Sequence, residues 1–315
     1  MTLHLCVTMC TRERPEMLSV CLNSVLPQLA TSSIQTSLVV VENSDSSTCR
    51  DLIARFKNAF PSVRIEYVLE PEPGIPFARN AGVERALMLQ ADWIIFIDDD
   101  EEACEGWFEN LTAAVDRWDA DVFHGPVRPI YPADCPDWLR MKQFDGGADG
   151  TIISSAATGN TMAHSRLFSA TGLGLRFDAG LRFSGGSDVE LFSRATQSGA
   201  TIRWINNAVV REHVPATRLS SRWLLLRTQR NAANTVTIMR KQYGYTSALA
   251  LGLSKAGRLA VEALAATLLL PVIGFRSEKT SRHIFKIRTK LAKLRGYFFS
   301  LLGFSPKPYR NVEGQ

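Results

Sequence analysis

The sequence lacks the features that mark several classes of protein. Its six cysteines are scattered without a CxxC pair, so we expect neither a zinc site nor a disulfide framework, and a reducing compartment suits the chain. It has no internal repeat and no low-complexity tract. The apolar stretch near the N-terminus is too short for a signal peptide and is followed at once by charge, which predicts a cytoplasmic protein.

Long hydrophobic runs are also missing. Residues 246–275 are largely apolar, but they contain Lys255, Arg258 and Glu262, and Pro271 interrupts the uncharged part. Because spanning a bilayer takes about 20 apolar residues, a simple transmembrane helix is not expected.

The length and the charge distribution set wide bounds. A chain of 315 residues can form one large α/β core or two smaller lobes. The net charge of +5 is concentrated near the C-terminus, where residues 276–310 contain ten Lys and Arg residues and a single acid. The rest of the chain is therefore mildly acidic.

Residues 93–102 (WIIFIDDDEE) carry the main local signal. Five apolar residues run directly into five acids, which predicts a strand buried on both faces, typical of a parallel sheet, followed by a charged turn. Ligands bind at the carboxyl ends of such strands, so Asp98, Asp99 and Asp100 are candidates to hold a polyanion and its Mg²⁺ or Mn²⁺. The alternative is a solvated acidic loop.

Strands and helices alternate around this stretch. We expect strands at 3–9, 37–41 and 64–69 and helices at 17–29, 49–60 and 77–90. This order predicts a doubly wound nucleotide-binding half. The pattern weakens after Trp107, where we expect helices at 108–118 and 166–171, strands at 120–125 and 201–210, and a Pro/Gly/Asp-rich connection at 126–150.

A second acidic site lies in the segment GGSDVE, residues 185–190. Two glycines permit a turn with unusual dihedral angles, and the residues that follow look helical, so Asp188 is expected near a helix start. Either it is catalytic, or it only complements the helix dipole.

Five segments occur along the chain in a fixed order: TMCTRERPEMLSVCLNSVLPQ, LVVVENSDSS, PGIPFARNAGVERA, WIIFIDDDEEACEGW and RFSGGSDVELFSRATQSGA. Together, over residues 3–235, they resemble the family 2 glycosyltransferases and, more narrowly, bacterial exopolysaccharide glucosyltransferases of the succinoglycan ExoM type. The resemblance implies a GT-A fold: an α/β, doubly wound mixed sheet with a helical C-terminal extension. It also implies inverting transfer of a hexose, most readily glucose, from a UDP-sugar with Mg²⁺ or Mn²⁺.

The resemblance divides the chain into three parts. Residues 1–105 would be the nucleotide-sugar-binding half and 106–215 the acceptor-binding half of one GT-A domain. Residues 216–315 would form a helical, basic, membrane-associated region.

The donor site is implied residue by residue. Glu42 stands where the family usually has an Asp that touches uracil. Asp98 or Asp99 would lie near the ribose, and Asp100 would bind the metal. The nucleotide base would be flanked by Thr11, Arg12 and Arg14. Arg79 would face the nucleotide or the diphosphate.

Asp188 matches the family's catalytic base, although Ser187 replaces the Glu that generally precedes it. A sugar hydroxyl is a poor nucleophile, so a carboxylate must take its proton as it attacks opposite the leaving diphosphate. Glu190 is the reserve candidate for the base.

Other residues are candidates for the metal or the acceptor. His213 would join the metal or be structural. Arg222-Trp223, in RLSSRW, resembles the QxxRW signature of processive synthases, but Leu219 replaces the Gln, which predicts that one sugar is added. These two residues would line the acceptor channel or pack at a helix start, and Gly159-Asn160 would position the acceptor.

The basic tail has an apolar stripe of helical spacing, formed by Ile284, Ile287, Leu291, Leu294, Phe298 and Leu301. Such a helix lies in the headgroup region of an anionic membrane, or it packs on the enzyme body. Few aromatic residues accompany the basic ones, so nucleic acid is not an expected partner. The resemblance implies a glycan or polyprenyl-linked acceptor and a place on the inner face of the plasma membrane.

Two other functions remain open. One is a catalytically inactive nucleotide-sugar-binding or scaffold protein, in keeping with Ser187. The other is a haloacid-dehalogenase-like phosphotransferase, which also has Asp-x-Asp after an apolar strand, but on its first strand; here it follows the fourth.

Overall fold

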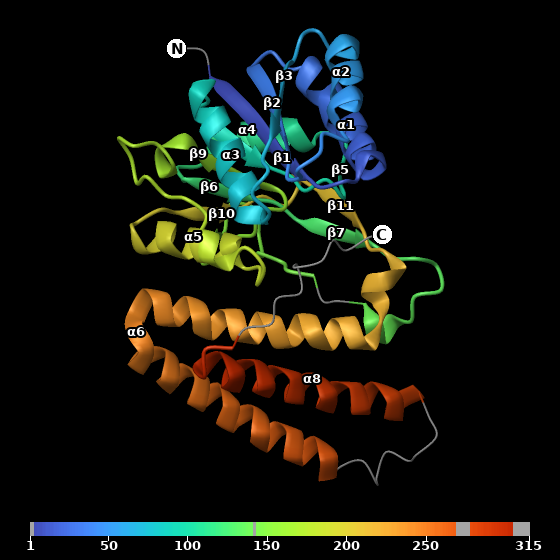
Figure 1. Cartoon of the computed structure of the whole chain (residues 1–315), viewed down its shortest axis with the longest axis vertical. Coiled ribbons are helices and arrows are strands. Elements are labelled where there is room, and N and C mark those ends of the chain that lie inside the picture. The colour runs from blue at the N-terminus through green and yellow to red at the C-terminus, as the bar shows by residue number, and fades with distance from the viewer. Residues whose placement is uncertain (1–2, 141–142, 269–277, 305–315) are drawn as a thin grey trace. The chain divides into compact units, whose positions relative to one another are not determined.

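The computed structural model describes residues 3–140, 143–268 and 278–304 (Figure 1). The chain separates into two compact units. The α/β unit comprises Met1–Ile130, Lys142–Arg182 and Ser187–His213. The helical unit comprises Tyr131–Met141, Phe183–Gly186 and Val214–Gln315.

The α/β unit begins with the predicted alternation of strands and helices. Its longer elements are β1 His4–Thr11, α1 Pro15–Ala30, β2 Gln35–Glu42, α2 Arg50–Ala59, β3 Arg64–Leu69, α3 Ile75–Met88, β4 Trp93–Phe96, α4 Trp107–Arg117 and α5 Ser187–Gln197. Its shorter strands are β5 Glu101–Ala103, β6 Val122–His124, β7 Val127–Ile130, β8 Ile152–Ile153, β9 Thr161–His164, β10 Ile202–Trp204 and β11 Val210–His213. Two 3₁₀ turns, η2 Ser165–Leu167 and η3 Ala179–Leu181, complete it.

The described strands form two sheets. The larger has the order β3-β2-β1-β4-β9-β6-β10-β8, and its first four strands are parallel. β9 runs antiparallel between β4 and β6, with Thr161 opposite both Phe96 and His124. The start of β9 therefore lies at the same edge as the carboxyl ends of β4 and β6. The smaller sheet has the order β5-β11-β7.

Helices cover both faces of the large sheet, which explains why its central strands are apolar throughout (Figure 1). Alternate residues of β4 enter different core clusters: Trp93 and Ile95 pack with residues of α1 and α4, whereas Ile94 and Phe96 pack with residues of α3 and α5. Burial on two faces fixes the register of β4 and hence the position of the acids that follow it.

Three sequence expectations need correction. The acidic residues Glu101 and Glu102 belong to strand β5 rather than to a turn, because β5 pairs with β11. The single strand expected at 201–210 is two strands in different sheets, separated by a turn at Asn206-Asn207, residue types that favour turns. The short helix expected at 166–171 is only the 3₁₀ turn η2.

The helical unit consists mainly of α6 Ser221–Leu268 and α8 Glu278–Leu301, with the 3₁₀ turns η1 Asp137–Leu139 and η4 Ala216–Leu219. Gly244, with φ 84° and ψ 173°, breaks α6 into two helical segments joined at a kink. No helix in the described parts of the chain is long and apolar enough to cross a membrane.

The contact between α6 and α8 uses small residues. Ala292, Gly296 and Ser300 of α8 are buried, and the Ser300 hydroxyl donates a hydrogen bond to the Ala233 carbonyl at 3.0 Å. A side chain at Gly296 would overlap the Gln229 carbonyl, so glycine allows the helices to approach closely. The predicted apolar stripe is consequently half exposed, with 58% of Phe298 accessible.

Candidate active site

Several predicted site residues gather at one edge of the large sheet. Thr11 ends β1, Asp98 is the second residue after β4, and Asn160 directly precedes β9. Asp188 lies in the first turn of α5, as the sequence predicted. This edge is formed by the carboxyl ends of the parallel strands, where α/β proteins bind ligands.

Asp98, Asp100, Asp188 and Arg79 form what we call the acidic cluster. The Nη2 atom of Arg79, on α3, lies 3.4 Å from the Oδ1 atom of Asp98. Burial raises the pKa of Asp98, Arg79 opposes this, and the negative charges of Asp100 and Asp188 raise it further. Burial lowers the pKa of Arg79, but the negative charges of Asp98 and Asp188 outweigh it, so that the pKa is raised. The acids from two distant sequence segments thus share one electrostatic environment.

Asp99 contacts residues at the end of β1 and just after it. Its Oδ2 accepts a hydrogen bond from the Thr11 hydroxyl at 2.7 Å, and Arg14 lies 3.8 Å from its Oδ1. Burial and the charge of Asp100 raise the pKa of Asp99 to about 7, although Thr11 and Arg14 favour its ionised form. The neighbouring Arg12 keeps a buried Nε atom without a hydrogen-bond partner in the described protein. Two residues predicted for the base region, Thr11 and Arg14, therefore contact Asp99.

Glu42 is fully buried and holds the turn after β2. It accepts hydrogen bonds from the backbone N–H of Thr48 at 3.0 Å, the hydroxyl of Thr48, the N–H of Cys49 and the Tyr67 hydroxyl at 2.6 Å. Burial raises the pKa of Glu42, but the hydrogen bonds from Thr48, Tyr67 and Cys49 outweigh it and lower the pKa. Both carboxylate oxygens are occupied by protein donors, so the longer side chain at this position braces the loop.

The two acids of α5 are in different situations. The Asp188 Oδ1 accepts a hydrogen bond from the Val189 N–H at 2.8 Å, and the side chain is half-buried. Glu190 is buried and makes a two-pronged ion pair with Arg194, at 2.7 and 2.8 Å. Such a pair holds a carboxylate firmly, which favours Asp188 over Glu190 as the proton acceptor.

His213 lies beside the acidic run in the small sheet. Its backbone N–H donates to the Asp100 carbonyl at 3.4 Å, but its ring Nε2 contacts the Glu102 carboxylate. Within the described residues, no group of three His, Cys, Asp or Glu side chains is arranged as a metal site. The roles of Asp100 and His213 as metal ligands stay predictions.

Asn160 is a structural brace. It is fully buried at φ 57°, its amide donates to the carbonyls of Pro126 and Ala208 at 3.0 and 2.6 Å, and its Oδ1 accepts from the Trp107 indole at 2.7 Å. Gly159 is needed for space, since a Cβ there would lie 2.5 Å from the Glu101 Oε1. Their role toward an acceptor stays a prediction.

Arg222 and Trp223 belong to the helical unit. Trp223 packs beside a small cluster that contains Leu139 and Leu224, and Arg227 lies over its ring, 5.3 Å from the centroid. This agrees with a packed helix start, and the predicted acceptor channel is untested.

Two residues of this edge were missed. Glu101 is buried, and its Oε2 accepts the Asp98 N–H at 3.0 Å; burial and the charge of Asp98 raise the pKa of Glu101. His124 ends β6, its Nδ1 lies 2.7 Å from the Thr161 hydroxyl, and burial lowers its pKa to about 4. The rule that ligands bind at carboxyl ends of strands was applicable to His124, because it is the last residue but one of the strand expected at 120–125.

Comparison with known proteins places these features in context. A sequence profile of the family described as Glycosyl transferase family 2 matches residues 6–179. The succinoglycan biosynthesis protein ExoM of Rhizobium meliloti (strain 1021) is 30% identical over 267 residues, which cover 84% of this chain and 85% of that protein.

Solved structures support the fold alone, because their identities are low. TarS 1-349 of S. aureus in complex with UDP-GlcNAc has a TM-score of 0.54 at 12% identity, covering 96% of this chain and 92% of that one. GalNAc-T7 with UDP, GalNAc and Mn²⁺ has a TM-score of 0.52 at 15% identity, covering 73% of this chain and 51% of that one. The predicted GT-A-type mixed sheet with C-terminal helices is confirmed.

Proposed function

Because the chain belongs to glycosyl transferase family 2, we propose that it transfers a hexose from a UDP-sugar to a hydroxyl of a glycan or lipid-linked acceptor in exopolysaccharide synthesis. The similarity to ExoM supports the pathway class, and the UDP-GlcNAc complex of TarS supports a UDP-sugar donor. UDP-glucose is the proposed donor, following the resemblance in sequence.

The single observation that carries the proposal is the shared environment of Asp98, Arg79 and Asp188. The first two residues come from the nucleotide-binding half, whereas Asp188 comes from a helix ninety residues further along. Inverting transfer needs a diphosphate-binding group and a proton acceptor around one sugar ring, on opposite sides of it, and the closeness of these three side chains supports such a pocket.

We propose Asp188 as the base. As the acceptor oxygen forms a bond to the anomeric carbon, its proton passes to the Asp188 carboxylate. The bond from the anomeric carbon to the diphosphate oxygen breaks, and UDP leaves with the electron pair. One displacement converts an α-linked donor into a β-glycoside. Arg79 would stabilise the charge on the leaving diphosphate through its fork of donors.

The side chains at this edge fit Mg²⁺ or Mn²⁺. Asp100 offers hard oxygen donors beside Asp98. Burial and then the negative charge of Asp100 raise the pKa of Asp98, as expected of neighbouring carboxylates that a cation would stabilise. Mg²⁺ commonly uses one or two protein carboxylates together with substrate phosphates, so a three-residue ligand set is not required. When bound, the metal would neutralise charge on the diphosphate.

We also propose a peripheral contact with the inner face of the plasma membrane. Exposed apolar side chains on α8, together with its basic neighbours, support this contact. The basic residues alone would attract an anionic surface, and the apolar ones would add burial.

A donor screen tests the proposal. The purified full chain is incubated with UDP-, GDP- and TDP-sugars, with Mg²⁺, Mn²⁺ or EDTA, and the released nucleoside diphosphate is measured. We expect metal-dependent release of UDP, at least tenfold above GDP and TDP, and a β-configured product by NMR. Binding of UDP-sugars without any turnover would support the inactive binding protein instead. Phosphate release from phosphomonoesters would support the phosphotransferase.

A further inference from the structure

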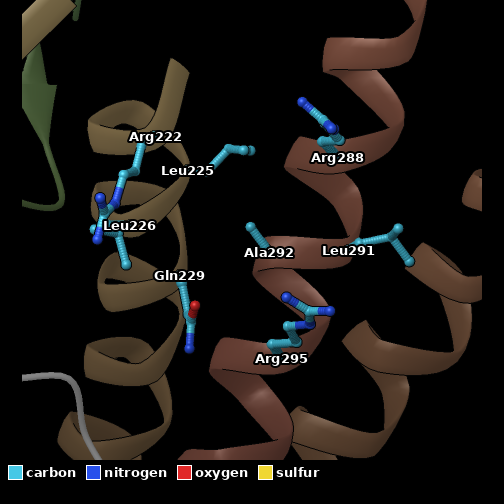
Figure 2. A pocket seen from close by; sticks show the side chains of 8 residues that line it. All are labelled: Arg222, Leu225, Leu226, Gln229, Arg288, Leu291, Ala292 and Arg295. Atoms are coloured by element: carbon cyan, nitrogen blue, oxygen red, sulfur yellow. The ribbon is translucent and has the colours of Figure 1, made fainter. Parts of the chain in front are cut away.

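The helical unit contains a groove between the first segment of α6 and α8. It has a volume of about 370 Å³ and is lined by Arg222, Leu225, Leu226, Gln229, Arg288, Leu291, Ala292 and Arg295 (Figure 2). All of these residues belong to one compact unit, so the groove does not depend on the position of the α/β unit.

The construction of the groove follows from the packing of the two helices. Gly296 brings α8 close to the Gln229 backbone, and a Cβ there would lie 2.8 Å from the Ala232 Cβ. The buried Ala292 lies one helical turn earlier and is too small to fill the space. Larger apolar side chains, Leu225, Leu226 and Leu291, remain at its sides, and Leu226 and Leu291 are exposed by 47% and 43%.

The charge of the groove has one sign. Arg222 comes from α6, and Arg288 and Arg295 come from α8 (Figure 2). No carboxylate is among the lining residues. The acid on α6 that reaches α8, Glu262, is bound to Arg258 at 2.8 Å and to Lys290 at 2.7 Å. Three guanidinium groups next to leucines favour a ligand that is anionic at one end and apolar at the other.

We infer that this groove binds the terminal phosphate or diphosphate of a membrane lipid, with the first part of the lipid chain against the leucines. A phosphodiester carries one negative charge, whereas a terminal phosphate carries about 1.5 to 2 at neutral pH, which matches three arginines better. Guanidinium forks also suit the several oxygens of a terminal phosphate. The groove is large enough for a headgroup and a short part of a chain.

The inference deepens the proposed membrane contact and rests on it. It differs in being a defined site: a diffuse basic surface responds to the total charge of a membrane, whereas the groove would distinguish a terminal phosphate from a phosphodiester at the same surface charge. It does not require transfer activity, and its test uses no nucleotide sugar.

The test measures binding of the full chain to two kinds of vesicle. Both contain phosphatidylcholine; one adds phosphatidic acid and the other adds phosphatidylglycerol, at amounts that give the same zeta potential. We expect the parent to bind phosphatidic acid vesicles at least tenfold more tightly. The variant R222Q/R288Q/R295Q should lose this preference. The matched control R240Q/K286Q/K293Q removes three exposed charges outside the groove and should weaken both vesicle types alike, keeping the preference.

Two further measurements keep the inference falsifiable. The variant L226N/L291N retains the arginines and should weaken binding to phosphatidic acid vesicles severalfold. If circular dichroism shows that the triple groove variant does not fold, the comparison of L226N/L291N with the parent takes its place as the test of the groove. Inorganic pyrophosphate should bind the parent more weakly than the lipid does.

Several outcomes would overturn the inference. One is a parent that binds phosphatidic acid and phosphatidylglycerol vesicles equally tightly. Another is an equal loss of the preference for phosphatidic acid in the two triple variants. A third is pyrophosphate binding as tight as lipid binding, together with unchanged lipid binding in L226N/L291N. A parent that prefers phosphatidic acid but transfers no sugar would contradict the proposed transferase and leave the groove assigned.

Discussion

The two compact units handle charge and apolar surface in opposite ways. The α/β unit buries acids and supplies partners for them: Glu42 has four donor groups, Asp99 has Thr11 and Arg14, and Glu190 has Arg194. The helical unit exposes apolar side chains. Of the 21 large apolar side chains exposed in the described residues, 13 belong to it, although it is the smaller unit.

This difference shows what each unit can do. Asp99 lies between Asp98 and Asp100, and Glu190 lies in the same helical turn as Asp188, so their fixed partners help to hold the neighbouring acids of the cluster in a set geometry, as catalysis requires. Exposed apolar and basic side chains support the contact with a lipid surface that we propose for the helical unit. Substitutions that act inside one unit should therefore affect turnover or folding, whereas those on the surface of the other should affect membrane binding.

The largest effect is expected at the acidic cluster. Asp100→Asn removes a proposed metal ligand and its charge, and should lower kcat/KM about 10²- to 10³-fold and raise the Mg²⁺ concentration needed for half-maximal rate. Steady-state kinetics over a metal titration measure both. Glu105→Gln, which changes an exposed acid five residues further along the chain, is the control. Similar rates in parent and Asp100→Asn would remove Asp100 from the site.

The second prediction concerns stability and pH at the buried His124, whose pKa is lowered to about 4 by burial. Unfolded His binds a proton near pH 6.5, whereas the folded form does not, so stability present above pH 6.5 is lost as the pH falls toward 4. The loss amounts to about 3 kcal/mol. Urea unfolding at several pH values should show a flatter profile for His124→Gln. Parallel profiles would mean that His124 does not titrate in this way.

The fold of the first hundred residues was predictable from sequence for a physical reason. Parallel strands buried on two faces are continuous apolar runs, and the helices between them have a regular apolar spacing, so β1 to β4 and α1 to α3 could be placed. The position of Asp188 near a helix start followed from the glycines that precede it. Gly185 and Gly186 have φ of 72° and 82°.

Long-range pairing could not be predicted. Strand β5 consists of Glu101, Glu102 and Ala103, which have no strand pattern, and it forms only because β11 lies beside it. The roles of Glu42 and Asn160 were equally hidden, since their partners lie 25 and 53 residues away in Tyr67 and Trp107. The apolar stripe of α8 could be recognised in the sequence. The contact of its small residues with α6 could not.

The smallest of these effects is expected in the helical unit. Gly296→Ala should lower the free energy of unfolding by about 1–3 kcal/mol, because the new methyl group overlaps the Gln229 backbone. Gly257→Ala, also on a helix, is the matched control, since nothing lies within 4 Å of its Cβ position. It should be neutral or stabilise the protein by up to about 1 kcal/mol. Equal effects of the two substitutions would contradict the close contact between α6 and α8.

The most direct measurement of the central claim compares sugar transfer by the parent, Asp188→Asn and Glu190→Gln, with UDP-sugar binding measured in parallel. We expect Asp188→Asn to lower kcat by about 10²- to 10⁴-fold, while donor affinity changes less than threefold. Folded Glu190→Gln should keep most of the parental rate. A parental kcat in Asp188→Asn would contradict the account.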